Sequence, residues 1–361
     1  MSGDHGPPAV TTHDVALIPG DGIGPEVVDA TLPAVEAVAA REGFDVATTR
    51  YDWGTERYLE TGAMMPDDGL DRLRDHDAIL LGAVGHPDVA DHITLNGLLL
   101  PIRKGFDLSV CLRPCELLDG VESPLRGYEP GDIDFVVYRE NTEGQYADVG
   151  GREHDGHPND VAVQSSVFTR RGCERIIRPA FEAATERDGT VTSVTKSNSQ
   201  AYGMVFWDEM VDEIGAEYPD VEVDRMLVDA ASMDLVRRPE AYDVVVASNL
   251  FGDILTDVGA AVSGSMGLAP SANVDPDGAY PGMFEPVHGS APDIAGQGVA
   301  NPVACVRSAA MLLETLGETA AADALDGAVR DVLADPEAPL TPDLGGSADT
   351  AAVRDAIVDR L

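Results

Sequence analysis

Asp253 and Asp257 are four residues apart in a helical pattern, so both carboxylates are expected on one helix face. They follow Val244–Val246, whose consecutive β-branched residues predict a strand buried on both faces. Ser248 and Asn249, between the two, are favourable helix N-cap residues. Like charges at this spacing repel weakly, whereas a hard divalent cation such as Mg²⁺ or Mn²⁺ reverses the sign of their interaction. The pair therefore indicates either a metal site or an acidic solvated helix face.

Three arginines stand where they could bind a substrate with several carboxylates. Arg103 and Arg113 are ten positions apart and separated by apolar residues. Arg139 directly follows Ile133–Tyr138, a predicted buried strand. The planar guanidinium group binds a carboxylate through two parallel hydrogen bonds. Arg103 and Arg113 alone could be surface ion pairs, but the addition of Arg139 favours a substrate with two or more carboxylates.

Lysine is scarce, because only Lys104 and Lys196 occur among the 24 Lys+Arg residues. In a chain this poor in lysine, each of the two is a candidate for a specific task. A lysine can act as a general base when nearby cations and partial burial lower its pKa.

The composition combines a strongly acidic surface with an ordinary core. The 64 Asp+Glu residues give a formal net charge of −40, and hydrophobic residues make up 44% of the chain. Such a coat indicates a halophilic protein in a salt-rich cytoplasm, where screening relieves self-repulsion. The sequence has no basic stripe to meet phosphates, so nucleic-acid binding is not expected.

The chain is expected to be a cytoplasmic protein without a membrane partner. It has no apolar run long enough for a membrane span, and no signal peptide opens it. Its four cysteines form no C-x-x-C pair, so neither a zinc ribbon nor a disulfide framework is indicated. The polar stretch Met1–His13 is predicted to be a frayed tail.

A glycine-rich turn, Pro19–Glu26, follows the short predicted strand Val15–Ile18. It fails the dinucleotide fingerprint, because Pro25 stands where the third glycine is needed. Pro25 suits the first turn of a helix, predicted over Pro25–Ala40. A second buried strand with a glycine turn follows at Ala78–Leu81. This alternation predicts an α/β sheet without a Rossmann phosphate loop.

The segment Arg139–Tyr146, R-E-N-T-E-G-Q-Y, closely resembles the signature of the β-decarboxylating dehydrogenases of 2-hydroxy acids, the isocitrate and 3-isopropylmalate dehydrogenase family. Further matching motifs follow in the family's order, and the resemblance covers nearly the whole chain from Val15. These motifs are Val194–Asn198, Val228–Ala231, Asn249–Asp257, Glu285–Ile294, Gly296–Pro302 and Thr341–Gly346.

The resemblance implies a role for each matching residue. Arg103, Arg113 and Arg139 would bind the substrate carboxylates. Asp253 and Asp257, with Asp229 from a second subunit, would hold Mg²⁺ or Mn²⁺. Tyr146 and Lys196, the latter also from the partner, would be catalytic and handle protons. The cofactor-binding residues would be Glu285, His288, Gly289, Ser290, Ala291, Asp293 and Asn301.

The resemblance also implies a two-domain isopropylmalate-dehydrogenase-like fold, with a mixed sheet flanked by helices. A discontinuous cofactor-binding domain would combine residues 1–108 and 267–361. Residues 109–266 would carry the substrate and metal groups and the homodimer contact, with an exposed arm at Gly144–Ser166. Because Lys196 and Asp229 would come from the partner, the two subunits would share their active sites.

The expected reaction is oxidation of a 2-hydroxy dicarboxylic acid, with decarboxylation where a β-carboxylate is present. NAD is expected as the cofactor, because Asp293 can accept hydrogen bonds from a ribose and would repel a 2′-phosphate. A monovalent cation such as K⁺ is a further candidate cofactor.

The residues before Arg103 resemble the tartrate and D-malate dehydrogenase branch, so one of these acids is the expected substrate. 3-Isopropylmalate dehydrogenase is the alternative: Leu99 and Leu100 fit it, but the acid usual near Asn96 is missing. Asn96 also departs from the tryptophan expected in the tartrate branch. Isocitrate dehydrogenase usually has a serine and an asparagine upstream of Arg103, and a non-catalytic regulatory subunit would lack catalytic residues that this chain keeps.

Overall fold

The computed structural model describes residues 10–361, which form two compact units. One is discontinuous and combines residues 10–98 with Pro281–Leu361, and the other is the central unit, Leu99–Tyr280. The expected limits at 108 and 267 differ from this division, which places Arg103 in the central unit with the other candidate substrate-binding arginines.

The discontinuous unit contains four parallel strands in the order β2 (Asp45–Arg50), β1 (Thr12–Gly20), β3 (Ala78–Ala83) and β12 (Gly282–Pro286). Helix α1 (Gly24–Glu42) packs against β1, β2 and β3, while α10 (Val303–Thr315) packs against β12 and β3. The remaining helices are α2 (Thr55–Thr61), α3 (Gly69–Leu73), α4 (Asp91–Thr94), α11 (Thr319–Ala334) and α12 (Thr350–Val358), with a 3₁₀ turn at Pro342–Leu344.

The strands of the central unit form a mixed arrangement. Their order is β11 (Pro270–Val274), β4 (Val110–Glu116), β5 (Asp134–Glu140), β10 (Val244–Ala247), β8 (Thr190–Thr195) and β9 (Glu222–Leu227). The β11–β4 and β4–β5 pairs are antiparallel, and the other neighbours are parallel. The predicted α/β fold with a mixed sheet is therefore confirmed.

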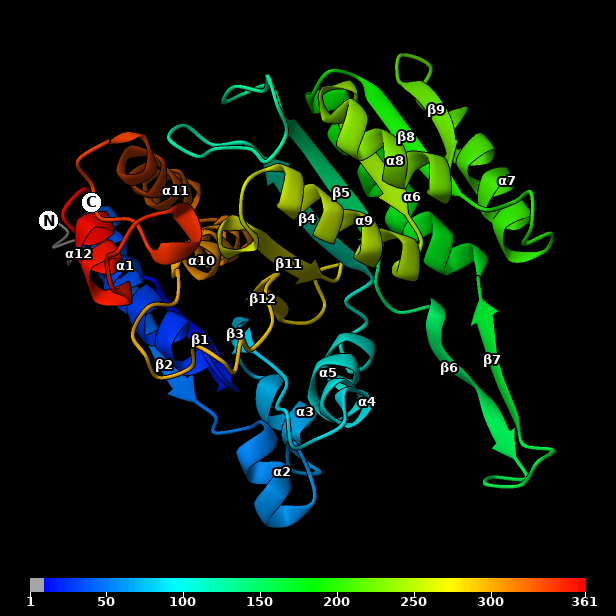
Figure 1. Ribbon diagram of the computed structural model, residues 1–361, viewed down its shortest axis with the longest axis horizontal. Coiled ribbons are helices and arrows are strands. Elements are labelled where there is room, and N and C mark those ends of the chain that lie inside the picture. The colour runs from blue at the N-terminus through cyan, green and yellow to red at the C-terminus, as the bar shows by residue number, and fades with distance from the viewer. Residues whose placement is uncertain (1–9) are drawn as a thin grey trace, which may run out of the picture. The chain divides into compact units, whose positions relative to one another are not determined.

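Helices cover the strands of the central unit. They are α5 (Leu100–Gly105), α6 (Arg170–Glu186), α7 (Gly203–Gly215), α8 (Val228–Arg237) and α9 (Asn249–Val262), with 3₁₀ turns at Pro239–Ala241 and Met266–Leu268. Helix α6 packs against β5, β8 and β10, and α9 packs against β4, β5 and β10. Strands β6 (Gly144–Glu153) and β7 (Val161–Val167) pair antiparallel as a separate two-stranded ribbon, which Figure 1 shows extending from the unit.

The predicted tail was partly wrong. Thr12 and His13 are the first residues of β1, where they pair with Asp45 and Val46 of β2. A parallel neighbour strand supplies hydrogen bonds that the polar composition did not reveal. Residues 1–9 of the predicted tail lie outside the described part of the chain. Within residues 10–361, no helix is long and apolar enough to cross a membrane.

Candidate active site

Helix α9 begins where the fully buried strand β10 ends, and this junction places the first polar groups of the site. Ser248 has the extended backbone of an N-cap, but its side chain makes no capping hydrogen bond. The Asn249 side chain instead accepts hydrogen bonds from Arg139 Nε and Nη2, at 3.2 and 2.9 Å. It also donates to the Glu143 carbonyl at 3.3 Å. A residue expected to cap the helix therefore orients a candidate substrate-binding arginine.

Asp253 is the centre of the cluster, because three candidate site residues converge on its carboxylate. Its Oδ1 lies 2.5 Å from Arg139 Nη1 and 3.4 Å from Arg113 Nη1. Its Oδ2 accepts a hydrogen bond of 3.0 Å from the Tyr146 hydroxyl. Arg113 also donates to Thr256 Oγ1 at 2.6 Å, one turn further along α9.

The close approach of α9 to β5 depends on Gly252. A Cβ atom at this position would lie 2.7 Å from both Cβ and Cγ of Arg139, closer than side-chain atoms normally approach. Arg139 is only 2% exposed. The missing side chain therefore makes room for a buried arginine between the helix and the strand.

The charges in this cluster shift one another's pKa values. Burial, aided by the Arg113 charge and opposed by Asp253, lowers the pKa of Arg139 to about 10. Burial would raise the pKa of Asp253, but Arg139 and Arg113 outweigh it and the pKa is lowered. The pKa of Tyr146 is raised by burial and by Asp253, so its hydroxyl keeps its proton near neutral pH.

Asp257 completes the acidic pair on α9. Partial burial and the neighbouring Asp253 charge raise the pKa of Asp257. A divalent cation between the two carboxylates would relieve that repulsion, and carboxylate oxygens are ligands that Mg²⁺ and Mn²⁺ prefer. The donor chemistry of Asp253 and Asp257 therefore fits such a cation.

Arg103 joins the same cluster from α5. It is 3% exposed, and its positive charge contributes to the lowered pKa of Asp253. The three arginines proposed from the sequence are thus brought together, although they come from α5, β4 and β5. Such a concentration of guanidinium groups suits a ligand with several carboxylates.

Lys196 and Asp229 lie elsewhere in the central unit and bind each other. Lys196 follows β8, and its Nζ forms an ion pair with Oδ1 of Asp229, the second residue of α8. The Lys196 hydrogen bond lowers the pKa of Asp229. Within residues 10–361 no hydrogen bond or ion pair joins these two to Asp253, and no group of three acidic, histidine or cysteine side chains could hold a metal. One chain does not bring the three candidate metal aspartates together.

The candidate cofactor residues lie in the discontinuous unit, at and after β12. Glu285 and Ser290 are buried, while Gly289 and Asp293 are exposed and Ala291 has a positive φ of 38°. His288 Nδ1 lies 3.0 Å from the Gly289 carbonyl, and burial lowers the pKa of the imidazole.

The chain beyond this segment adds a further candidate cofactor residue. The Asn301 amide donates to Asp343 Oδ2 at 3.0 Å and accepts from the Val303 amide at 3.0 Å. Asp343 lies in the Thr341–Gly346 motif, so this bond joins two of the segments that carry the family resemblance.

The glycine-rich turn after β1 supports this cofactor segment. The Ile23 amide donates to the Ser290 carbonyl at 2.8 Å, and a Cβ on Gly22 would collide with that carbonyl at 1.9 Å. Asp21 is buried and accepts hydrogen bonds from the Thr55 amide and hydroxyl, both at 2.7 Å. Asp21 and Gly22 were not among the predicted site residues, although the glycine-rich turn was the signal that could have identified them.

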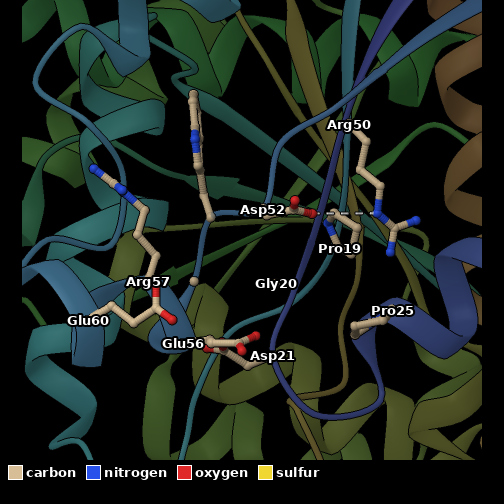
Figure 2. Close-up of a pocket in the computed structure, with 11 residues that line it drawn as sticks. Pro19, Gly20, Asp21, Pro25, Arg50, Asp52, Glu56, Arg57 and Glu60 are labelled. Atoms are coloured by element: carbon tan, nitrogen blue, oxygen red, sulfur yellow. Dashed lines mark ion pairs between the residues drawn. The ribbon is translucent and has the colours of Figure 1, made fainter.

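A cavity of about 470 Å³ lies beside the same turn (Figure 2). Two arginines, Arg50 and Arg57, line it, and Arg50 lies 3.8 Å from Asp52. Acidic side chains outnumber the arginines, so the cavity does not suit the diphosphate of a dinucleotide. Its charged acidic lining consists of Asp21, Asp52, Glu56 and Glu60.

Comparisons with known proteins agree with this geometry. Residues 14–357 match the family model described as isocitrate/isopropylmalate dehydrogenase. A probable tartrate dehydrogenase/decarboxylase of Agrobacterium vitis is 51% identical, with 97% of this chain and 98% of the relative covered. The decarboxylating D-malate dehydrogenase of Escherichia coli is 49% identical (96% and 98% covered), and the 3-isopropylmalate dehydrogenase of Thermobifida fusca is 50% identical (97% and 98%).

Among solved structures, the isocitrate dehydrogenase of Methylococcus capsulatus superposes with a TM-score of 0.87 at 37% identity. The match covers 96% of this chain and 99% of that one. The chain belongs to the isocitrate/isopropylmalate dehydrogenase family and is an oxidoreductase that acts on the CH–OH group of its donor.

Proposed function

We propose that this protein is an NAD- and divalent-metal-dependent dehydrogenase of D-malate or tartrate, with decarboxylation where a β-carboxylate is present. The observation that carries the proposal is the convergence of Arg113, Arg139 and Tyr146 on Asp253. The arginines are suited to bind the carboxylates of a ligand. The neighbouring aspartates are suited to hold a metal ion that binds the hydroxyl group of the same ligand.

The proposed roles follow from the chemistry of each side chain. Arg103, Arg113 and Arg139 bind and orient the substrate carboxylates. Lys196 accepts the hydroxyl proton, and Tyr146, which keeps its own proton near neutral pH, supplies a proton to carbon after CO₂ is lost. A bound Mg²⁺ or Mn²⁺, held by Asp253, Asp257 and a partner aspartate, would supply Lewis-acid stabilisation of negative charge beside the reacting carbon.

The choice among substrates rests on the segment before Arg103. The relatives named for tartrate, D-malate and 3-isopropylmalate are about equally similar overall, so total identity does not decide. Residues Leu95–Leu99 form a π-helical turn, a feature common at functional sites, and the Asn96 amide donates to the His92 carbonyl at 2.7 Å. The missing acid at Asn96 counts against 3-isopropylmalate, and the resemblance of the segment before Arg103 to the tartrate and D-malate dehydrogenase branch supports one of these acids, although Asn96 replaces the tryptophan expected in the tartrate branch.

An initial-rate panel tests this choice. D-malate, both tartrates, 3-isopropylmalate and isocitrate are compared with Mn²⁺ and saturating NAD, and D-malate or a tartrate is expected to have the highest kcat/KM. A preference for 3-isopropylmalate by about tenfold, or roughly 1.4 kcal/mol in transition-state binding, would overturn the assignment.

The cofactor proposal rests on Asp293, whose carboxylate would accept hydrogen bonds from a ribose and repel the 2′-phosphate of NADP. Activity with NAD should exceed activity with NADP, and Asp293→Asn should narrow the difference between them. Equal or better turnover of the wild type with NADP would contradict this part of the proposal.

We also propose a homodimer with shared sites, because Lys196 and Asp229 do not join the Asp253 cluster within one chain. The test mixes two inactive variants, Lys196→Ala and Asp253→Asn, and allows subunits to exchange. Random exchange makes about half of the dimers mixed, and each mixed dimer would carry one intact site of its two. Activity should therefore return to about a quarter of the wild-type value. A mixture that stays inactive after demonstrated subunit exchange would refute shared sites.

A further inference from the structure

Glu140 is a buried carboxyl group that the proposed chemistry does not use. It is the last residue of β5 and only 2% exposed. Its Oε1 accepts hydrogen bonds from the Thr142 amide (2.7 Å), the Thr142 hydroxyl (3.0 Å) and the Glu143 amide (2.9 Å). Its Oε2 accepts a further hydrogen bond of 3.0 Å from the Glu143 amide, and no cation pairs with the carboxyl group among residues 10–361. The side chain therefore folds back onto the loop that follows its own strand.

This loop, residues 140–144, is fixed at further points. The Glu143 carboxylate accepts from the Thr169 amide at 2.8 Å and from its hydroxyl at 2.6 Å, at the N-cap of α6. The Glu143 carbonyl accepts from Asn249, the residue that also binds Arg139. Gly144 has a φ of +66°, and a Cβ there would lie 3.3 Å from Cβ of Asn249. The loop is thus held between β5, α6 and α9.

Tyr146 lies only two residues beyond this loop. Its hydroxyl reaches Asp253 Oδ2 at 3.0 Å. A chain segment this short transmits a displacement of its anchored end to the tyrosine, and a shift of about 1 Å can misplace a reacting group enough to cost about 10²-fold in rate.

We propose that Glu140 is a positioning residue for Tyr146: its buried carboxyl group holds the 140–144 loop that sets the tyrosine hydroxyl against Asp253. The inference rests on the proposed role of Tyr146 in proton transfer. It adds a residue outside the Asp253 cluster that acts through the backbone amides of Thr142 and Glu143.

The cost of this arrangement to the fold supports a functional reason for it. Burial raises the pKa of Glu140 to about 7, against the opposing effect of the Thr142 and Glu143 hydrogen bonds. An acidic group buried without a cation is unfavourable when it ionises. Local features that cost stability are most often found where function requires them.

A double-mutant cycle tests the proposal, using Glu140→Ala, Tyr146→Phe and the double variant. Glu140→Ala leaves the two backbone amides and the Thr142 hydroxyl without their acceptor, so kcat should fall about 10- to 100-fold while KM changes less than about threefold. If Glu140 acts through Tyr146, the double variant should be no slower than Tyr146→Phe alone. If the fold reduction of kcat in the double variant equals the product of the two single reductions, Glu140 does not act through Tyr146 and the positioning role is overturned.

Glu140→Gln is the matched conservative variant. Its amide oxygen can keep the three hydrogen bonds that Oε1 accepts and loses only the second, 3.0 Å contact of the Glu143 amide with Oε2. The variant should therefore retain kcat within about threefold if hydrogen-bond geometry matters rather than charge. A Gln variant as slow as Glu140→Ala would contradict the proposal. Circular dichroism and melting temperature check folding, and Glu140→Asp replaces alanine in the cycle if the alanine variant does not fold.

The same cycle separates the two hypotheses. If Tyr146→Phe alone keeps wild-type kcat, the proposed catalytic role of Tyr146 fails, and the positioning role that rests on it falls with it. If Tyr146→Phe lowers kcat, and adding Glu140→Ala lowers kcat further by the same factor as in the wild type, only the inference about Glu140 fails.

Discussion

At the scale of single residues, the site depends on one carboxylate that serves several partners. Asp253 accepts from Arg113, Arg139 and Tyr146, and with Asp257 it offers the oxygen ligands that suit a divalent cation. The two arginines keep the Asp253 carboxyl ionised despite its burial. Asp253 is therefore ready to bind a cation without first losing a proton near neutral pH.

Replacing Asp253 with asparagine should lower Mn²⁺ affinity by at least about 100-fold, because a charged oxygen ligand is lost from a small donor set. Isothermal titration in concentrated KCl measures this while suppressing weak binding to surface acids. Asp257→Asn should show a comparable loss, and Asp293→Asn, in the discontinuous unit, serves as the unaffected control. Wild-type Mn²⁺ affinity in Asp253→Asn would exclude the residue as a ligand.

Glu140 should make stability depend on pH in a defined direction. Its pKa is raised in the folded protein to about 7 from an ordinary value of 4.5, so the folded state binds the proton more tightly. Wild-type stability from this group is then highest below about pH 4.5 and falls as pH rises towards 7 and above. Glutamine does not ionise, so the Glu140→Gln variant should not lose stability at this position as pH rises.

The free energy of unfolding of Glu140→Gln relative to wild type should therefore rise between pH 5 and pH 8, by up to roughly 3 kcal/mol. Denaturant titrations at the two pH values, at constant salt, measure the change. A difference between the two proteins that stays constant with pH would show that Glu140 does not titrate in this range.

At the scale of elements, α9 must lie close enough to β5 for Arg139 to reach both Asn249 and Asp253. Gly252 permits that approach, since a Cβ there would contact the Arg139 side chain at 2.7 Å. The helix therefore both carries the two acidic residues and packs against Arg139, a proposed substrate-binding arginine.

Gly252→Ala should displace Arg139, lowering kcat/KM about 10- to 100-fold and costing about 1–3 kcal/mol of stability from overpacking. The matched control is Gly327→Ala in α11, where a Cβ would lie within 4 Å of nothing outside the adjacent residues and backbone of its own helix. This substitution should stabilise the helix by up to about 1 kcal/mol. Steady-state kinetics and thermal unfolding give both quantities. Unchanged kinetics in Gly252→Ala would mean that Arg139 tolerates the shift.

The β6–β7 ribbon carries apolar side chains that residues 10–361 leave exposed. Val161 and Val163 are 49% and 56% exposed, and their alternation places them on one face of β7. In the proposed homodimer this face would contact the partner.

Replacing Val161 and Val163 together with aspartate should therefore weaken dimerisation and, through the shared sites, reduce activity. Light scattering over a range of concentrations measures the first effect. Ala162→Asp, on the opposite face of the strand, is the control. A dimer of unchanged affinity in the double variant would remove this face from the proposed interface.

At the scale of the whole molecule, the net charge of −40 makes stability depend on salt. Self-repulsion is screened over about 10 Å at 0.1 M salt and about 3 Å at 1 M. The melting temperature should therefore rise steeply with KCl from about 0.1 to 1 M. Differential scanning calorimetry measures this dependence, and equal ionic strengths of NaCl and KCl separate screening from binding of a specific cation. A melting temperature independent of salt would contradict halophilic adaptation.

The ordered motifs predicted the family, and the alternation of strands and helices predicted the α/β class; both predictions are confirmed by the family match and by the solved isocitrate dehydrogenase. Strands such as β10 and helices such as α9 could be predicted because their apolar periodicity and flanking residues are local features. The start of β1 could not, because His13 is held by a neighbouring strand rather than by its own sequence.

What the sequence determined by itself was the set of reactive residue types: three arginines, paired aspartates, a tyrosine and a scarce lysine. The tertiary structure decided which of them meet. It brings Arg103, Arg113, Arg139 and Tyr146 to Asp253 but leaves Lys196 with Asp229. It also gave Asn249, Asp21 and Glu140 supporting contacts: all three lie in segments that the sequence singles out, but the segments do not show which partner each side chain meets. The physical reason is that such contacts join residues distant in the chain, or depend on burial, and spacing along a sequence encodes neither.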